Sequence, residues 1–147
     1  MKNNTISEIQ LKYHSNRVGK FKIKSSSDAF KCLKSAWNLD TIELQEEFKM
    51  LLLNRANEVL GVHALSKGSM TGTLVDLRLL FAVVLKSAAC SIIMCHNHPS
   101  GNLSPSEADK RLFRKITKAA ELLDIQVLDN LIISKNGYLS FADEYIV

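Results

Sequence analysis

Two histidines and an aspartate in the segment HNHPSGNLSPSEAD, residues 96–109, are well suited to bind a metal ion. His96 and His98 are separated by one residue and follow an apolar run, so on a strand both imidazoles point to the same face. Asp109 adds a carboxylate further along the chain. Two imidazoles and one carboxylate, with one coordination position left open, are typical of a catalytic zinc site. The segment therefore predicts a centre for one Zn²⁺ ion held by His96, His98 and Asp109.

Asp109 occupies an unusual position for a charged residue, because it falls on the apolar side of a predicted helix. A helical wheel of residues 106–123 places the following residues in one arc: Ala108, Leu112, Phe113, Ile116, Ala119, Ala120 and Leu123. Asp109 lies inside this arc, and burying a carboxylate is costly unless it is paired or binds a metal. Ser106 lies one turn earlier, at the edge of the same face. Taken singly, each histidine or the aspartate could be an ordinary buried residue, but their joint occurrence favours a shared ion.

The elements that would position these side chains follow from the apolar pattern. SIIMCHN, residues 91–97, is apolar at both alternating sets of positions, as is typical of a central strand covered by helices on both faces. The pattern SPSE at residues 104–107 predicts a capped helix start with its proline at the first helical position. The helical periodicity then continues to about Leu123.

The other segments complete a predicted α/β domain. Helical spacing after a run of serines predicts a helix over residues 27–37, and residues 76–87 are apolar nearly all round, which predicts a buried helix. Residues 48–54 and 58–66 predict one hairpin, and residues 125–134 and 138–143 predict another with Lys135, Asn136 and Gly137 at its turn. Residues 1–24 are predicted to form an N-terminal arm or edge strand, and residues 25–147 the domain.

Composition limits the classes of function. The 147 residues, 46% hydrophobic and 23% charged, suit one soluble globular domain. Neither a signal peptide nor a membrane span is predicted, since no apolar run is long enough, so we expect a cytoplasmic protein without a membrane partner. The three cysteines lack C-x-x-C spacing and predict neither disulfides nor a thiolate zinc site. A net charge of +4 permits a polyanionic partner without requiring one.

Other zinc sites fit this sequence less well. A nucleobase deaminase needs a P-C-x-x-C segment, which is missing here. A three-histidine site would need His14 or His63, both on upstream segments that are not expected to converge on His96.

The motif resembles that of a known family. H-x-H-P, followed by Ser106 and Asp109 with ten residues between His98 and Asp109, resembles the JAMM motif of JAB/MPN metallopeptidases. HNHPSG with PS before the aspartate is similar to the bacterial RadC branch. The resemblance extends over LLLNRANEVLG, SKGSMTGTLVD, IQVLDNLII and YLSFADE, and so covers roughly residues 40–147.

The resemblance implies a single JAB/MPN-like, cytidine-deaminase-like domain with a mixed β-sheet flanked by helices. It implies that His96, His98 and Asp109 bind zinc and that Ser106 steadies the oxyanion of a tetrahedral intermediate. It also implies that an upstream glutamate acts as general base, with Glu43, Glu46, Glu47 and Glu58 as candidates, of which the family pattern selects Glu46. The implied reaction is hydrolysis of an amide or isopeptide bond in a peptide substrate.

This chain departs from the family pattern at a few positions. Family members often have Pro-Arg-Glu where residues 77–79 read LRL, a threonine where Phe113 stands, and a histidine where Asn130 stands. None of these departures removes a predicted metal ligand.

Two other functions remain open at this point. The first is DNA binding in repair, supported by basic residues on one helix face and in the arm: Lys110, Arg111, Arg114, Lys115, Lys118, Lys12, Arg17, Lys20, Lys22 and Lys24. The second is a metal-binding but inactive interaction module, which would need His96, His98 and Asp109 but not Glu46.

Overall fold

The computed structural model describes residues 5–10, 12, 14–15, 21–68 and 75–147. In chain order the elements are α1 (Ser26–Ser35), β1 (Glu47–Leu53), β2 (Val59–Lys67), α2 (Leu77–Lys86), β3 (Ser91–Asn97), α3 (Glu107–Leu122), β4 (Gln126–Ser134) and β5 (Gly137–Ser140). The strands form one mixed sheet in the order β2-β1-β3-β4-β5, with β3 and β4 parallel and the other pairs antiparallel. The predicted α/β architecture is confirmed.

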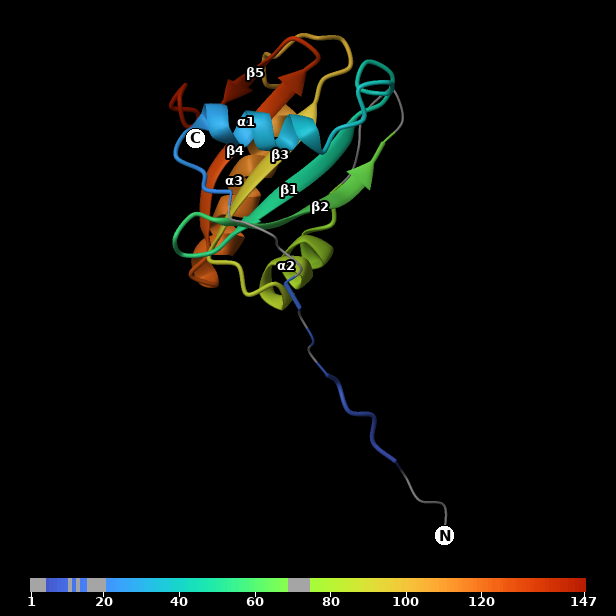
Figure 1. Cartoon of the computed structure of the whole chain (residues 1–147), viewed down its shortest axis with the longest axis vertical. Helices are drawn as coiled ribbons and strands as arrows, with labels where there is room; N and C mark the ends of the chain where they lie inside the picture. Colours follow the sequence, from blue (N-terminus) through green and yellow to red (C-terminus); the bar gives the residue numbers. More distant parts are fainter. Residues whose placement is uncertain (1–4, 11, 13, 16–20, 69–74) are drawn as a thin grey trace.

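The sheet lies between two helical layers. Figure 1 shows α1 across one face of the sheet and α3 behind the opposite face, with α2 at the lower end. Every residue of β3 is buried, as expected for a central strand. Ile93 and Cys95 belong to the apolar cluster that includes residues of α1, whereas Ile92 and Met94 belong to the cluster that includes residues of α2 and α3. By alternation, His96 faces the α3 side.

Helix α3 begins two residues later than the sequence predicts. Its N-cap is Ser106, whose side chain accepts a hydrogen bond from the Asp109 amide, and the Asp109 side chain accepts one from the Ser106 amide. The predicted start used Ser104 as the cap, but Asp109 completes a reciprocal pair of bonds with Ser106 instead. Pro105 consequently precedes the cap rather than occupying the first helical position.

Helix α2 is only half buried, whereas the sequence predicted a buried helix. Leu80, Phe81 and Val84 are buried, but Leu79 is 61% and Leu85 is 55% exposed. The helix packs at the end of the sheet near β2, so a single stripe of its surface has a partner within the described part of the chain. The exposed side carries Leu79, Ala82 and Leu85 besides two charged residues, so the apolar pattern alone did not show that this side lacks a partner.

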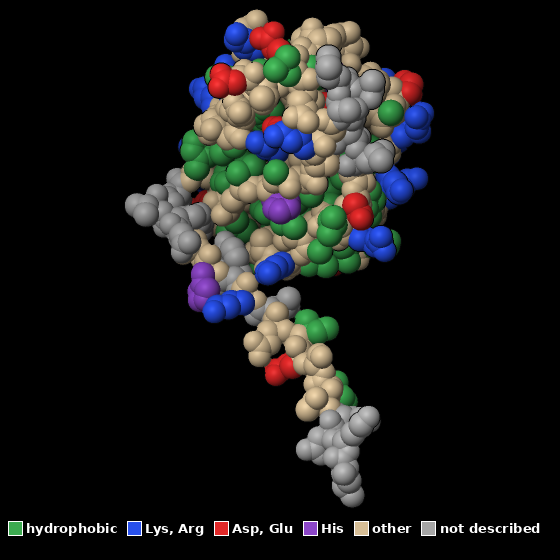
Figure 2. Space-filling model, turned by 90° about the vertical axis from the view of Figure 1, so that its right-hand side faces the viewer, with side chains coloured by type: hydrophobic (Ala, Val, Ile, Leu, Met, Phe, Trp, Pro, Cys, Tyr) green, Lys and Arg blue, Asp and Glu red, His purple; other side chains and the backbone are tan. Residues whose placement is uncertain are grey.

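The remaining predicted elements are present. Helix α1 begins after the cap residue Ser25, and both hairpins form, although the second turn consists of Lys135 and Asn136 while Gly137 already pairs in β5. In the N-terminal segment, Lys22 forms an isolated bridge with Glu58 beside β2. Residues 5–10 extend away from the domain (Figure 1 and Figure 2). Within the described residues, no helix combines the length and the apolar character needed to cross a membrane.

Candidate metal centre

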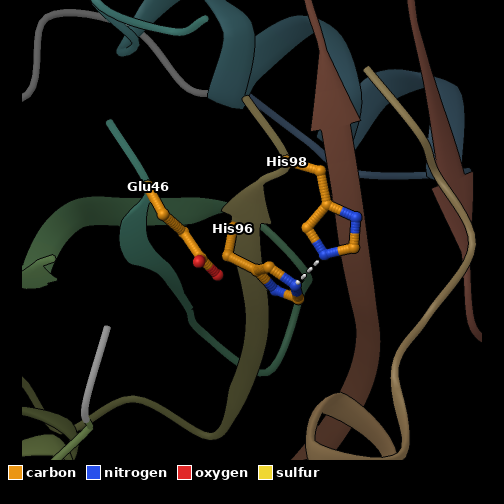
Figure 3. A group of neighbouring side chains, drawn as sticks. All are labelled: Glu46, His96 and His98. Carbon is orange, nitrogen blue, oxygen red and sulfur yellow. Dashed lines mark hydrogen bonds between the residues drawn. The ribbon is translucent and has the colours of Figure 1, made fainter. Parts of the chain in front are cut away.

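His96 and His98 direct their Nε2 atoms at each other. His96 is the sixth residue of β3, and the backbone amide of His98 continues the pairing with β4 by donating to the Ile133 carbonyl at 3.0 Å. The alternation of the strand therefore holds through His98, and both imidazoles point to the same side. Their Nε2 atoms lie 3.1 Å apart (Figure 3).

Asp109 completes this pair from the first turn of α3. One carboxylate oxygen lies 3.3 Å from His96 Nε2 and the other 3.2 Å from His98 Nε2. Burial alone would raise the pKa of Asp109, but its hydrogen bonds with the two imidazoles outweigh burial and hold this pKa well below the ordinary range. The hydrogen bond that His98 donates to Asp109 is the main reason that the pKa of His98 is raised. The three predicted ligands thus converge, with an ionised carboxylate between two imidazoles.

The backbone fixes which nitrogen of His98 is available. His98 Nδ1 lies 2.6 Å from the Asn102 carbonyl oxygen, which can only accept a hydrogen bond, so Nδ1 carries the proton. Nε2 is therefore the nitrogen that can bind a metal ion once His98 is neutral, in place of its hydrogen bond to Asp109. The His96 ring is held differently, by stacking on Phe48 at 5.6 Å between ring centroids.

Ser106 has a structural role at this site. Its Oγ accepts from the Asp109 amide at 3.0 Å, while its own amide donates to an Asp109 carboxylate oxygen at 2.9 Å. These two bonds fix the Asp109 side chain relative to the helix start. The cap uses a lone pair of the Ser106 oxygen, so the hydroxyl hydrogen stays available to a further acceptor.

Glu46 is the glutamate that lies beside the histidines. A carboxylate oxygen of Glu46 and one nitrogen each of His96 and His98 all lie within 4.8 Å of one another, and Figure 3 shows the carboxylate pointing toward the imidazoles. The other candidates have partners elsewhere. Glu47 pairs with Lys67 at 3.2 Å and Glu43 with Lys135 at 3.6 Å.

Glu58 and the two other histidines lie away from this group. Glu58 accepts a hydrogen bond from Asn54 at the turn between β1 and β2. His63 is an exposed residue of the edge strand β2, and His14 is exposed in the N-terminal segment.

Asn97, between the two histidines, positions the segment that carries Glu46. Its side chain faces away from the imidazoles and is fully buried. Its Oδ1 accepts from the Glu47 amide at 2.7 Å, and its Nδ2 donates to the carbonyls of Gln45 at 2.9 Å and Ile42 at 2.7 Å. Asn97 thus binds the residues on either side of Glu46. Sequence analysis missed this role, although a polar residue on the apolar face of a buried strand was a usable signal.

A cavity of about 250 Å³ opens beside the candidate centre. Glu46, His96 and Asp109 line it together with Asn130 and the apolar residues Phe48, Val75, Met94, Leu112, Phe113 and Ile116. Two of the positions at which this chain departs from the family pattern, Phe113 and Asn130, therefore lie at this cavity.

Comparison with known proteins decides the family. Residues 23–146 match the model of the RadC-like JAB domain. The chain belongs to this family. Its mixed sheet and helices are consistent with the JAB fold, and the residues that carried the resemblance are those at the candidate centre.

The relatives of this RadC-like JAB domain are longer proteins. A UPF0758 protein of Flavobacterium johnsoniae is 48% identical over 126 residues, which cover 85% of this chain and 53% of the relative. A UPF0758 protein of Chlorobaculum tepidum is 34% identical over 142 residues, covering 97% of this chain and 63% of the relative. A UPF0758 protein of Porphyromonas gingivalis is 44% identical over 101 residues, which cover 68% of this chain and 44% of the relative. The chain thus spans less than two thirds of each of these relatives.

Proposed function

We propose that this domain is a zinc-dependent hydrolase of amide or isopeptide bonds. The observation that carries the proposal is the convergence of His96, His98 and Asp109, with the Glu46 carboxylate beside them. These donors suit zinc, which accepts imidazole nitrogen and carboxylate oxygen and binds catalytically through three protein ligands. When bound, zinc lowers the pKa of a water ligand to about 7 and polarises the substrate carbonyl.

Three residues around the centre would transfer the proton, stabilise the oxyanion and position the general base. Glu46 accepts the proton of the attacking water at its carboxylate and delivers it to the leaving amine. Ser106 donates its free hydroxyl hydrogen to the developing oxyanion, while its cap bonds keep Asp109 in place. Asn97 holds Glu46 at the histidines through the flanking backbone.

The position of Glu46 separates this proposal from that of an inactive metal-binding module. Such a module has no need of a carboxylate near the metal, yet Glu46 lies within 4.8 Å of the histidine nitrogens. The backbone around Glu46 is also held in place. Asn97 binds the neighbouring residues Gln45 and Glu47, and the Glu46 carbonyl accepts a hydrogen bond from the Gly68 amide at 2.9 Å.

DNA binding stays a prediction. Of the basic residues on which it was based, Lys110 pairs with Glu107 at 3.6 Å. Arg17 and Lys20 lie outside the described residues. On the face drawn in Figure 2, basic side chains are scattered among acidic ones.

The test uses purified protein loaded with zinc and two fluorogenic substrates, one cleaved at a peptide bond and one at a lysine isopeptide bond. Glu46→Gln should retain one zinc per chain and lose at least about 100-fold in kcat, the usual contribution of a general base. His96→Ala should lose both zinc and activity.

Glu43→Gln is the matched control, because Glu43 is exposed and pairs with Lys135 rather than with the histidines. It should behave like the unmodified protein. Zinc binding without hydrolysis of either substrate would replace the hydrolase proposal with that of a binding module.

A further inference from the structure

We propose that the cavity beside the centre binds a phenol side chain, that of tyrosine, and that Asn130 recognises its hydroxyl group. The inference deepens the proposed function, because it names the substrate side chain that this domain would bind next to the scissile bond. It depends on the way the cavity extends inward, on its apolar walls and on the buried Asn130 Oδ1, which has no hydrogen-bond partner among the described residues.

The cavity leads from the centre into the core. In the parallel pair of β3 and β4, Met94 is opposite Asn130 and His96 is opposite Ile132. The Asn130 row therefore lies two residues below the His96 row, about 7 Å at ~3.3 Å per residue. Ala108 is exposed at the open end, whereas Met94 and Ile116 are fully buried at the other. The cavity thus extends inward from the metal ligands.

Its size and walls suit a ring. A volume of about 250 Å³ exceeds the ~150 Å³ at which an engineered apolar cavity binds benzene. Phe48, Leu112 and Phe113 supply aromatic and aliphatic walls. A single six-membered ring therefore fits and would bury most of its surface against carbon.

Asn130 determines which kind of ring is favoured. Its side chain is 2% exposed, and among the described residues no hydrogen-bond partner meets its buried Oδ1. A buried polar atom without a hydrogen-bond partner costs free energy. A ligand that donates a hydrogen bond to this atom should therefore bind more tightly than one that does not. A phenol hydroxyl can donate this bond, and a phenylalanine ring cannot. A lysine ammonium is disfavoured at this inner end, because one neutral amide oxygen does not compensate for removing a charge from water, and the carboxylates of Glu46 and Asp109 lie beside the histidines instead.

The test measures binding of two probes, p-cresol and toluene, to metal-free protein by ligand-observed NMR titration. These are the side chains of tyrosine and phenylalanine as free molecules. We expect p-cresol to bind about tenfold more tightly than toluene, a difference that one net hydrogen bond can supply. In Asn130→Leu the order should reverse, because the phenol then leaves water without regaining its hydrogen bond.

Two further variants make the result specific to this cavity. Ala108→Trp adds an indole at the exposed rim and should abolish binding of both probes without disturbing the buried core. Asn130→Asp retains an acceptor oxygen and should keep the preference for p-cresol. Each variant is first compared with the unmodified protein by thermal unfolding.

The outcomes separate this inference from the proposed hydrolysis. Failure of p-cresol to bind, or an unchanged preference in Asn130→Leu, overturns the assignment of the cavity whatever the zinc titration shows. Preference for p-cresol that depends on Asn130 supports it even if the zinc-loaded protein cleaves neither fluorogenic substrate.

Discussion

Asp109 is the single residue on which most of the site depends, because it serves two purposes. Its carboxylate lies between the two imidazoles, and it also accepts the hydrogen bond that closes the start of α3. The Asp109 carboxylate is therefore held both by the Ser106 amide at the helix start and by the two histidines. Two substitutions can separate these roles.

Asp109→Asn and Asp109→Ala should differ in stability but not in their failure to bind zinc well. Asparagine can still accept from the Ser106 amide, so the capping box persists, whereas alanine removes it and should cost about 1 kcal/mol more in the free energy of unfolding. Both remove the charged ligand and should weaken zinc binding strongly. Urea unfolding of the metal-free variants and calorimetric zinc titration measure the two effects, and equal stability of the variants would contradict the dual role.

The metal-free protein should lose stability as the pH rises above neutrality. The pKa of His98 is raised, first by its hydrogen bond with Asp109, so the folded state binds this proton more tightly than the unfolded state. The resulting stabilisation is fully present below the unfolded-state pKa of about 6.5 and is lost as the pH rises through the folded-state pKa. The depressed pKa of Asp109 acts in the opposite sense, and its contribution is lost only in acid.

The measurement is urea unfolding of protein kept in chelator at about pH 6 and pH 8.5. The free energy of unfolding should be lower at the higher pH, and Asp109→Asn should show a smaller difference. An equally large fall in that variant would assign the effect to other groups.

At the scale of elements, the end of β3 serves both faces of the sheet. His96 projects toward α3 and the candidate centre, while the next residue, Asn97, projects to the opposite side and binds the segment before β1. One strand end thus supplies a candidate metal ligand and also sets where Glu46 lies. The alternation of side chains along a strand makes both possible within three residues.

Asn97→Ala should separate catalysis from metal binding. It leaves the Glu47 amide and two buried carbonyls without their partner, which should lower the free energy of unfolding by about 1–3 kcal/mol. The histidines keep their places, so zinc stoichiometry should be retained, while kcat falls because Glu46 is no longer held. Asn136→Ala, at the exposed turn between β4 and β5, is the matched control. Unchanged kcat in a folded Asn97→Ala protein would refute the positioning role.

At the scale of the whole molecule, the candidate centre joins segments that are distant in the sequence. Glu46 precedes β1, the histidines lie at the end of β3, and Asp109 begins α3. Because these segments come together only in the folded chain, an ion bound there favours folding over unfolding. Zinc should therefore raise the free energy of unfolding of the whole domain.

Zinc at about a thousandfold excess over its Kd should stabilise the protein by about 4 kcal/mol, which corresponds to a rise in Tm on the order of 10 °C for a domain of this size. Differential scanning calorimetry with zinc or with chelator measures this shift. His98→Ala should lose the shift, and His63→Ala should keep it, since His63 is exposed on the edge strand β2. A similar shift in both variants would mean that zinc binds elsewhere.

The sequence by itself determined the family, the order of helices and strands, and the choice of His96, His98, Asp109 and Glu46 as the residues to examine. All but Glu46 depend on local spacing: a period of two along a strand, a period of 3.6 along a helix, and a motif contained within fourteen residues. Glu46 lies outside that motif and was selected by the family pattern. Spacing of this kind can be read without knowing which elements meet.

Tertiary structure alone decided the rest. Asn97 takes its importance from the residues that it binds elsewhere in the chain, and Asn130 from the cavity that it lines. The exposed side of α2 depends on which part of the helix the sheet covers. Helix α3 begins after Ser106 rather than Ser104, because Ser106 and Asp109 form two reciprocal hydrogen bonds at the helix start. Packing and reciprocal hydrogen bonds depend on neighbours in space, and a linear pattern of residues does not contain that information.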